Sequence, residues 1–476
     1  MPGSRRGAAV LGALLASLAP ACGHAQTAPA APDASTPAAP RADSAVLFKA
    51  TLDALGVYYV QQIDRGELTT VALKSMLASL DGHSTYMTPK EFTDFNEAMS
   101  GKISGIGVVL ETAAGATRVV APVDGGPAAR AGIGAGWELT GVNGSSARGK
   151  TLPQVIQMLR GNAGEPVDVE FADLSGRAVT YHLIRELIQI NSVYQRRIGE
   201  IGYLRITGFT RTTDAEFGTA LDKLLKAGPV KGILLDMRNN SGGIVDTAVA
   251  LASRFLQPGQ VVVRSGKTAD QSTATAASAS GGTVPKVPVV IVINGGTASA
   301  AEIVSAALHD NGRARLVGLT SFGKGLVQTV FPINNGAEGA VSITTQRYYT
   351  PSGHSIQQVG IAPDLVVARS ADEARDVVND RQFSEARLPH ALANEGGVSR
   401  QVLREVEAPP PTPAAPPPLF VHPLLSDSEL AGDFQLVRAL DLLNAQISGT
   451  VTTPHRGVIV RRDETVASKV AVTAGP

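Results

Sequence analysis

The sequence predicts an α/β protein with three parts: a core of alternating strands and helices, an inserted mostly-β domain, and helical segments at both ends. Residues 202–367 alternate short β-branched apolar runs with segments whose apolar residues have helical spacing, which is the pattern of strand–helix–strand units. Residues 99–187 instead contain short strands bounded by glycine and asparagine turns. At 476 residues, the chain is long enough for two or three domains.

The composition excludes several classes of function. The formal charge is zero, and residues 1–25 hold two arginines and no acid, so 40 basic and 42 acidic residues remain beyond them. This balance argues against nucleic acid as the main partner. The eight histidines are scattered without the spacing of metal ligands, so we expect no metal and no cofactor.

The first 25 residues are typical of an export signal. An arginine pair at positions 5–6 precedes an apolar stretch at 8–18, and small residues follow. Cleavage after Ala21 or after Ala25 fits this pattern. The apolar stretch is too short to span a membrane, and no later segment approaches the roughly 20 residues that a span requires. We therefore predict export to the periplasm.

Cys22 is the only cysteine of the chain and leaves two alternatives open. Residues 18–22 weakly resemble a bacterial lipoprotein box, and in that case Cys22 carries a lipid anchor. Otherwise Cys22 is removed with the signal, and the mature protein then has neither a disulfide nor a catalytic thiol. Residues 26–43, rich in Ala, Pro and Thr, predict a flexible spacer.

Residues 287–308 predict a strand that turns sharply into a helix. Positions 287–293 are a mostly β-branched apolar run, Asn-Gly-Gly at 294–296 ends it, and helical spacing follows. Ser299 therefore lies at a helix start, where backbone N–H groups carry partial positive charge. Such a serine is either an N-cap or a nucleophile whose reaction produces an oxyanion.

Lys324 follows 25 residues after Ser299 and lies between two glycines. A lysine acts as a base only when it is neutral. Its pKa of about 10.4 must therefore fall by roughly 3 units, at a cost of about 4 kcal/mol, for it to work near neutral pH. Burial in an apolar pocket lowers the pKa of a lysine in this way, and the two glycines allow a close backbone approach.

These two stretches together resemble the signature of the carboxy-terminal processing peptidases, also called tail-specific proteases. The resemblance rests on Asn-Gly-Gly-Thr-Ala-Ser-Ala-Ala-Glu at 294–302, on Phe-Gly-Lys-Gly at 322–325, and on Gln328. It implies that Ser299 is the nucleophile, that Lys324 is the general base and that Gln328 holds the lysine. It also implies an α/β core of the type shared with Clp proteases and crotonases.

A second stretch resembles the same family. Residues 236–243 match its Asp-Leu-Arg-x-Asn-Pro-Gly-Gly turn, with Ser241 in place of the proline. The resemblance implies that Gly242 or Gly243 supplies one oxyanion N–H group and that Ala300 supplies the other.

Three polar residues each have two interpretations. His83 lies in a segment that resembles the family's Asp-Pro-His-Ser-x-Tyr motif, with Gly82 replacing the proline. It is either the base of a serine–histidine pair or a loop histidine satisfied by backbone groups, and we favour the second because a lysine base leaves it no role. Asp236 and Arg238 either pair with each other or contact substrate.

Residues 99–187 resemble a PDZ domain. By this resemblance, Gly105, Ile106 and Gly107 would present the N–H groups that hold a peptide carboxylate, and the peptide would add as a strand beside Val108. The alternative is a PDZ fold that only packs against the core.

Two positions depart from the family pattern. Trp137 stands where an aspartate is usual, so it either covers an apolar surface or lines the path of the substrate. His354 replaces a usual arginine, and the sequence offers no functional reason for this change.

After the core, residues 371–383 predict a helix, and the proline-rich stretch near 408–418 predicts an extended linker. Apolar residues then recur at helical spacing between 430 and 443. This helix would expose an apolar stripe if it stood alone, so we expect it to dock on another subunit or on a partner.

The predicted segments are a signal peptide (1–25), a flexible spacer (26–43), an N-terminal helical region (44–98), a PDZ domain (99–187), a serine peptidase core (188–370), a helical extension (371–408), a proline-rich linker (409–418), a C-terminal docking helix (419–449) and a disordered tail (450–476).

The sequence thus predicts an exported serine endopeptidase that cleaves proteins near nonpolar carboxyl termini and captures those termini with a PDZ domain. We expect a homo-oligomer and an adaptor or activator protein as partners. The alternative from another class is a PDZ adaptor with a silent peptidase core. A nucleotide-binding loop at 318–324 is disfavoured, because Gly325 stands where Mg²⁺ binding needs Ser or Thr.

Overall fold

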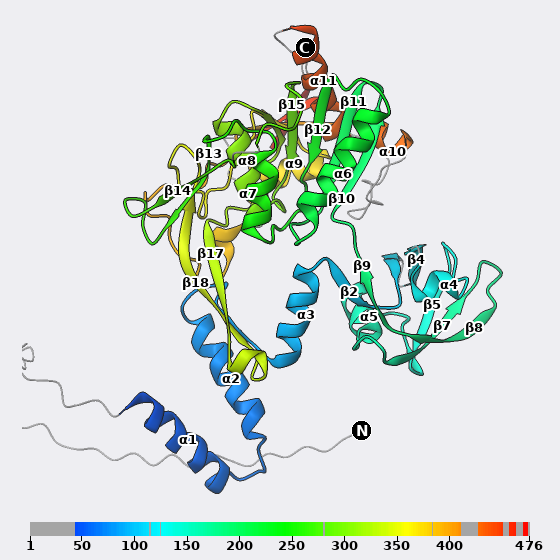
Figure 1. Cartoon of the computed structure of the whole chain (residues 1–476), viewed down its shortest axis with the longest axis vertical. Coiled ribbons are helices and arrows are strands. Elements are labelled where there is room, and N and C mark those ends of the chain that lie inside the picture. The colour runs from blue at the N-terminus through cyan, green and yellow to red at the C-terminus, as the bar shows by residue number, and fades with distance from the viewer. Residues whose placement is uncertain are drawn as a thin grey trace, which may run out of the picture. The chain divides into compact units, whose positions relative to one another are not determined.

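The computed structural model describes residues 43–113, 116–123, 125–278, 281–382, 384–410, 427–450, 457–462 and 470–474 (Figure 1). The chain divides into two compact units, residues 1–68 and residues 69–476. The predicted signal peptide (1–25), all but the last residue of the spacer (26–43) and most of the linker (409–418) lie outside the described residues.

The described part of the first unit is helical. Helix α1 (Ser44–Tyr58) begins after Asp43, whose carboxylate accepts a hydrogen bond from the Ala45 N–H at 2.9 Å. No residue of α1 is buried. Helix α2 (Arg65–Ala78) begins in this unit and continues into the second.

The core of the second unit is a six-stranded sheet. Its order is β10 (Val193–Ile198), β11 (Ile201–Ile206), β12 (Gly232–Asp236), β15 (Val289–Ile293), β16 (Arg315–Gly318) and β19 (Leu365–Val366). The strands from β11 to β19 are parallel, and β10 pairs antiparallel with β11. Every residue of β12 and β15 is buried, as the continuous apolar runs of a covered parallel sheet predict.

Helices cover both faces of this sheet. Helices α6 (Thr213–Lys226), α7 (Val245–Ser253) and α8 (Ala300–Asp310) share one apolar cluster with one face (Figure 1). Helix α11 (Phe434–Ser448) packs on the other face, where Leu436, Ala439 and Leu443 contact Tyr203 and Val290. The predicted α/β core is therefore confirmed.

The packing of α11 corrects one prediction. We expected the C-terminal docking helix to bind another subunit or a partner, but it binds its own sheet, preceded by the short helix α10 (Asp427–Gly432). Its buried Arg438 forms an ion pair with the equally buried Glu407, with Nε at 2.8 Å from Oε1. The sequence pattern missed this because it identified the apolar stripe but not the sheet face that receives it.

A second sheet joins distant parts of the second unit. Its order is β1 (Thr85–Met87), β18 (Ala340–Tyr349), β13 (Val261–Gly266) and β14 (Thr273–Ala276), and β17 (Leu326–Pro332) also pairs with β18. Strands β17 and β18 form a hairpin around the 3₁₀ helix η1 (Asn334–Gly336). Strand β1 lies between α2 and α3 (Pro89–Met99) in the chain. Because β1 pairs with β18, this part of the second unit is joined to the second sheet.

The PDZ-like region is a separate small sheet with two helices. Its order is β3 (Val108–Ala113), β4 (Ala116–Pro122), β5 (Glu138–Val142), β7 (Pro166–Ala172) and β8 (Ala178–Ile184), with β6 (Ser145–Ser146) paired to β5. Helices α4 (Pro127–Arg130) and α5 (Leu152–Leu159) complete it. Strands β2 (Lys102–Gly105) and β9 (Glu186–Gln189) pair with each other at its two ends. The prediction of an inserted mostly-β domain is confirmed.

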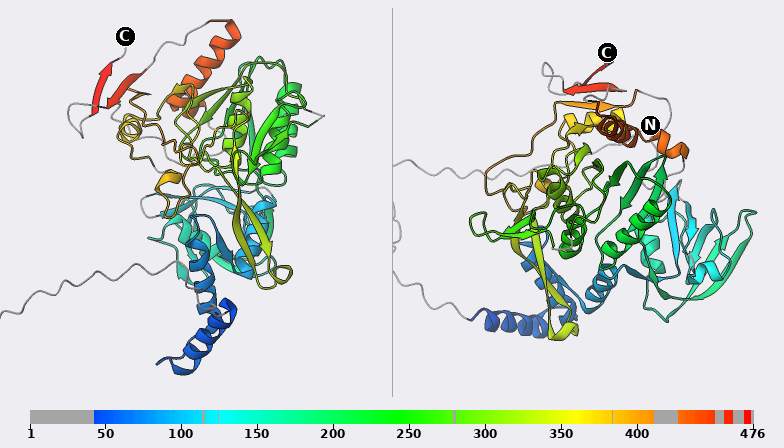
Figure 2. Two further views of the ribbon diagram at one scale, coloured as in Figure 1. Left: turned by 90° about the vertical axis from the view of Figure 1, so that its left-hand side faces the viewer. Right: turned by 45° about the horizontal axis from the view of Figure 1, so that its top comes forward.

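The C-terminal segments differ from two predictions. The helical extension contains α9 (Ala371–Val378), the 3₁₀ helix η2 (Glu385–Arg387) and then a strand, β20 (Glu405–Ala408). Strand β20 pairs with β21 (Val458–Arg462), which pairs with β22 (Val470–Ala474) (Figure 2). The prediction that residues 450–476 are disordered is therefore wrong for these two strands.

Breaking the buried pair that holds α11 should destabilise the second unit. Arg438→Ala removes the buried cation that pairs with Glu407, so we expect a loss of about 3–5 kcal/mol in the free energy of unfolding. Denaturant titration followed by circular dichroism measures it. The control is Arg461→Ala, which breaks the exposed pair with Glu405 and should cost less than about 1 kcal/mol. Equal losses in the two variants would contradict this role for Arg438.

Candidate active site

Ser299 lies in the turn that joins the buried strand β15 to helix α8, directly before the first residue of the helix. Thr297 Oγ1 bonds the N–H of Asn294 (3.0 Å) and the carbonyl of Met237 (2.9 Å), which fixes the turn against the end of β12. Ser299 itself has φ +55° and ψ −120°. A residue with a side chain adopts this conformation at a cost of about 1–3 kcal/mol, and such strain concentrates at functional sites.

The glycine turn after β12 lies directly against Ser299. A Cβ atom on Gly242 would lie 2.8 Å from Ser299 Cβ and 2.9 Å from the Ala300 nitrogen, so only glycine fits. The N–H of Gly242 donates to Asn240 Oδ1 at 2.9 Å. Among the described residues, the N–H groups of Gly243 and Ala300 have no hydrogen-bond partner. Of the two predicted glycine donors, the geometry therefore leaves the Gly243 N–H available.

The Lys324 loop is tied to the Ser299 turn through the backbone. The Phe322 N–H donates to the Thr297 carbonyl at 2.9 Å. The guanidinium of Arg400 donates to the carbonyls of Ser321 (2.7 Å) and Thr320 (3.0 Å) from the other side. These bonds hold the loop in one place before Lys324.

Glu302 joins the two loops directly. Its Oε2 atom accepts hydrogen bonds from the N–H of Ser299 (2.8 Å) and from the N–H of Lys324 (3.0 Å). Its Oε1 atom accepts from the Gly323 N–H at 2.8 Å and from the Ser321 hydroxyl. Glu302 is fully buried, and burial raises its pKa to about 7 although these four donors act to lower it. One carboxylate thus brings Ser299 and Lys324 together.

The Lys324 side chain is half-buried, and three carboxylates act on it. Burial lowers its pKa, against the charges of Glu385, Glu302 and Asp81, which raise it. Tyr348, which is 2% exposed, donates its hydroxyl to the Lys324 carbonyl and also interacts with the Ser299 side chain. Among the described residues, no hydrogen bond joins Ser299 Oγ to Lys324 Nζ. Such catalytic bonds are often long in structures without substrate.

Gln328 lies on β17 and does not bond Lys324 within the described residues. Its Nε2 atom donates instead to Thr344 Oγ1 on the neighbouring strand, at 3.2 Å. Its predicted role in holding the lysine remains a prediction.

We expected backbone groups to bond the His83 ring, but the structure gives it a side-chain partner instead. Its Nε2 atom lies 2.9 Å from both carboxylate oxygens of Glu385, which is fully buried. Because a carboxylate only accepts hydrogen bonds, Nε2 must carry a proton. This contact occupies one ring nitrogen of His83, and among the described residues no hydrogen bond joins His83 to Ser299.

Asp236 and Arg238 pair with each other, as the structural interpretation predicted. Arg238 Nη2 lies 2.7 Å from Asp236 Oδ2, and its Nη1 donates to Asp433 (3.0 Å) and Gln435 (3.1 Å). Both residues of the pair are buried. Since Asp433 caps the start of α11, this motif anchors the C-terminal helix on the sheet.

The predicted tail-binding residues line one groove between β3 and α5. Its volume is about 240 Å³, and Gly105, Ile106, Gly107 and Val108 all contribute to its wall. Gly107 has φ +75°, and the N–H groups of Ile106 and Gly107 bond no other described residue. Free N–H groups beside an apolar groove suit a peptide carboxylate and its last side chain.

The apolar part of the groove comes from residues that the sequence did not single out: Ile103, Leu110, Val123, Ile156, Leu159, Ile188 and Ile190. Trp137 is not among the lining residues. It packs against the domain core, with its ring centroid 6.2 Å from that of Tyr181. It therefore covers an apolar surface, which is one of the two interpretations of this residue.

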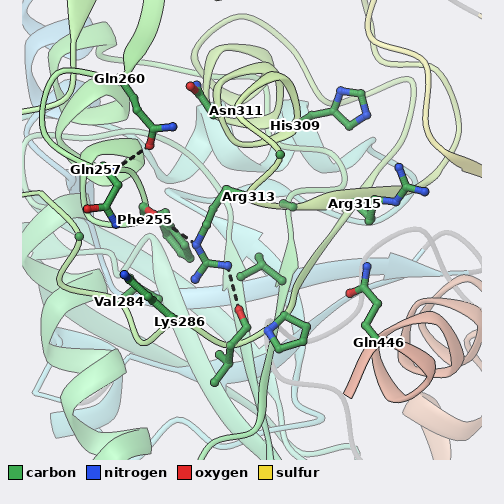
Figure 3. Close-up of a pocket in the computed structure, with 16 residues that line it drawn as sticks. Phe255, Gln257, Gln260, Val284, Lys286, His309, Asn311, Arg313, Arg315 and Gln446 are labelled. Atoms are coloured by element: carbon green, nitrogen blue, oxygen red, sulfur yellow. Dashed lines mark hydrogen bonds between the residues drawn. The ribbon is translucent and has the colours of Figure 1, made fainter. Parts of the chain in front are cut away.

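A cavity of about 680 Å³ lies elsewhere (Figure 3). It borders Val289 and Arg315, the first residues of β15 and β16, whereas Ser299 follows the other end of β15. Its guanidinium Arg313 is engaged with the carbonyls of Val287 and Pro285, each at 2.8 Å. This cavity is not part of the candidate active site.

The described residues contain no cluster of three or more histidine, cysteine, aspartate or glutamate side chains that could hold a metal ion. None of the described helices has the length and apolar character needed to cross a membrane.

Comparison with known proteins agrees with this geometry. The model of Peptidase family S41 matches residues 200–367, and a PDZ domain model matches residues 118–173. The carboxy-terminal-processing protease of Bartonella bacilliformis is 37% identical over 319 residues, which are 66% of this chain and 73% of that protein. The chain belongs to peptidase family S41. The predicted family, fold class and PDZ domain are therefore confirmed.

Two further proteins are similar to this chain. The carboxy-terminal processing protease CtpA of Bacillus subtilis is 34% identical over 309 residues, or 64% of this chain and 65% of that protein. A solved photosystem II D1 C-terminal processing protease has 30% identity and a TM-score of 0.41, and the match covers 67% of this chain and 85% of the other.

Sequence reasoning missed the part that Glu302 plays in this family S41 site. A signal was present, since Ser299 and Glu302 have the spacing of a capping box. Glu385 and Tyr348 carried no such signal, because they reach the site from distant parts of the chain.

Replacing Glu302 by glutamine should separate the two loops. The amide has one oxygen that accepts hydrogen bonds, whereas Glu302 accepts at two. In either orientation, the NH₂ group would therefore face two of the groups that now donate to Glu302. We expect kcat/KM to fall by about 100-fold, as small misplacements of catalytic groups do. Peptide hydrolysis measures the loss. The control, Glu405→Gln at an exposed pair, should leave activity unchanged, and activity near wild type in Glu302→Gln would refute this bridging role.

Proposed function

We propose that this chain is an exported serine endopeptidase that cleaves proteins near nonpolar carboxyl termini, with Ser299 as nucleophile and Lys324 as base. The observation that carries the proposal is the Glu302 carboxylate, which bonds the backbone of both residues through one oxygen. Burial lowers the pKa of Lys324 and so favours the neutral amine that a base requires.

In the proposed mechanism, Lys324 Nζ accepts the proton of the Ser299 hydroxyl as Oγ attacks the scissile carbonyl. The Gly243 and Ala300 N–H groups, at the positive end of α8, stabilise the resulting oxyanion. Lys324 then returns the proton to the leaving amine. Water, deprotonated by the same lysine, hydrolyses the acyl-enzyme and frees Ser299.

Export is proposed from the signal-like residues 1–25, with a lipid on Cys22 as the variant that anchors the protein to a membrane. The expected homo-oligomer and adaptor or activator stay predictions. The competing function is a PDZ adaptor whose core is silent, and the next experiment separates the two.

Ser299→Ala and Lys324→Arg should both abolish hydrolysis, because the first lacks the nucleophile and the second cannot give up its proton. In the wild type, burial lowers the pKa of Lys324. Activity should therefore rise with pH, and the midpoint of this rise should lie below the free lysine pKa of about 10.4. Initial rates of peptide cleavage from pH 5 to 10 measure this.

Binding of a tail peptide to Ser299→Ala, which should match the wild type, controls for folding. An inactive wild type that still binds tails would support the adaptor. Full activity in Lys324→Arg would exclude the lysine as base.

Substrate tails should be selected by the groove between β3 and α5. A free apolar tail should be cleaved at least about tenfold better than its amidated form, since a charged hydrogen bond contributes about 1.5–3 kcal/mol. It should also be cleaved better than an Asp-terminated form, whose charged side chain would lie in the apolar groove. The measurement is kcat/KM for three otherwise identical substrates. Equal values for all three would rule out tail recognition at this groove.

A further inference from the structure

The pair of His83 and Glu385 joins segments that are 302 positions apart in the sequence. His83 follows α2, and Glu385 begins η2 beyond the peptidase core. The side chain of Glu385 is fully buried, that of His83 is 15% exposed, and two contacts of 2.9 Å join them. Burying an ionisable pair is costly unless its hydrogen bonds are complete, so this arrangement requires an explanation beyond simple packing.

Glu385 holds the backbone on both sides of Lys324. Its N–H donates to the carbonyl of Phe322, two residues before the lysine, at 3.1 Å. Its Oε1 atom accepts from Gln357 Nε2 at 2.9 Å, and Gln357 Oε1 accepts from the N–H of Gly325 at 2.8 Å. Glu385 is therefore connected to the backbone before Lys324 directly and to the backbone after it through Gln357. We call these two connections the clamp.

The fit of this clamp is close. A Cβ atom on Gly325 would lie 2.8 Å from the Gln357 nitrogen, and one on Gly323 would lie 2.9 Å from the Gly360 nitrogen. Gln357 is fully buried. The backbone around Lys324 consequently has little freedom to move unless Glu385 and Gln357 move with it.

Glu385 also acts on Lys324 through its charge. Three carboxylates raise the pKa of the lysine: Glu385 from η2, Glu302 from α8 and Asp81 from the turn before β1. Burial acts in the opposite direction and is the largest effect. Of these three, Glu302 is committed to the Ser299 loop, and Asp81 bonds the N–H groups of its own turn, His83 and Ser84.

We propose that Glu385, held in place by His83, is a positioning residue for Lys324 that fixes the backbone on both sides of the lysine and keeps a carboxylate beside it. The proposal rests on the proposed function, because it needs Lys324 as the base. His83 acts through Glu385 and does not contact the substrate. This gives the half-buried histidine a role that differs from that of the base in a serine–histidine pair.

The test is the pH dependence of kcat/KM in the full chain. Glu385→Gln removes one negative charge near Lys324 and keeps a similar shape, so the midpoint should move about one unit to lower pH. His83→Ala should move it in the same direction, because Glu385 loses the side chain that holds its charge near Lys324. The double variant should shift no further than Glu385→Gln alone, since both changes act through the same charge.

A matched control is Asp168→Asn. Asp168 also pairs with a histidine, His182, at 2.6 Å, but this pair lies on the PDZ sheet. Its midpoint should equal that of the wild type. A general effect of removing any paired carboxylate would appear in this variant as well.

Two results would overturn the proposal. One is a wild-type midpoint in Glu385→Gln, even with a lower rate at every pH, because the pair would then be only a structural tether. The other is an additive shift in the double variant. Lys324→Arg, measured in parallel, separates this from the failure of the proposed function: if Lys324→Arg is active, the lysine is not the base.

Discussion

The carboxylate of Glu302 is the interaction on which the candidate site depends. Two loops from different strand ends must meet for a serine and a lysine to act together. Glu302 joins them, since its Oε2 atom bonds both loops and its Oε1 atom bonds the lysine loop. Burying this carboxylate is costly, so the site is held by a group that is itself under electrostatic stress.

Around Glu302, the molecule is arranged as a set of long-range connections. The Asp236–Arg238 pair ties the oxyanion side of the site to α11. Glu385 ties the lysine side to His83. Segments that precede and follow the peptidase core thus reach the same few side chains, and the core sequence by itself does not contain everything that orders the site.

Much of this could be predicted from the sequence, for a physical reason. Residues 287–299 and 236–243 are local signals, in which a buried strand, a glycine break and a helix start follow one another within a few positions. The pairs His83–Glu385 and Arg438–Glu407 were not predictable, because the charge patterns that form them are separated by most of the core or by an irregular linker.

The position of α11 has a consequence for chains that are cut short. One face of the central sheet, including Tyr203 and Val290, packs against Leu436, Ala439 and Leu443 of this helix. A chain that stopped in the proline-rich linker would lack this cover and leave apolar sheet surface exposed to water, which invites aggregation. Residues far beyond the catalytic loops are therefore needed to close the peptidase core.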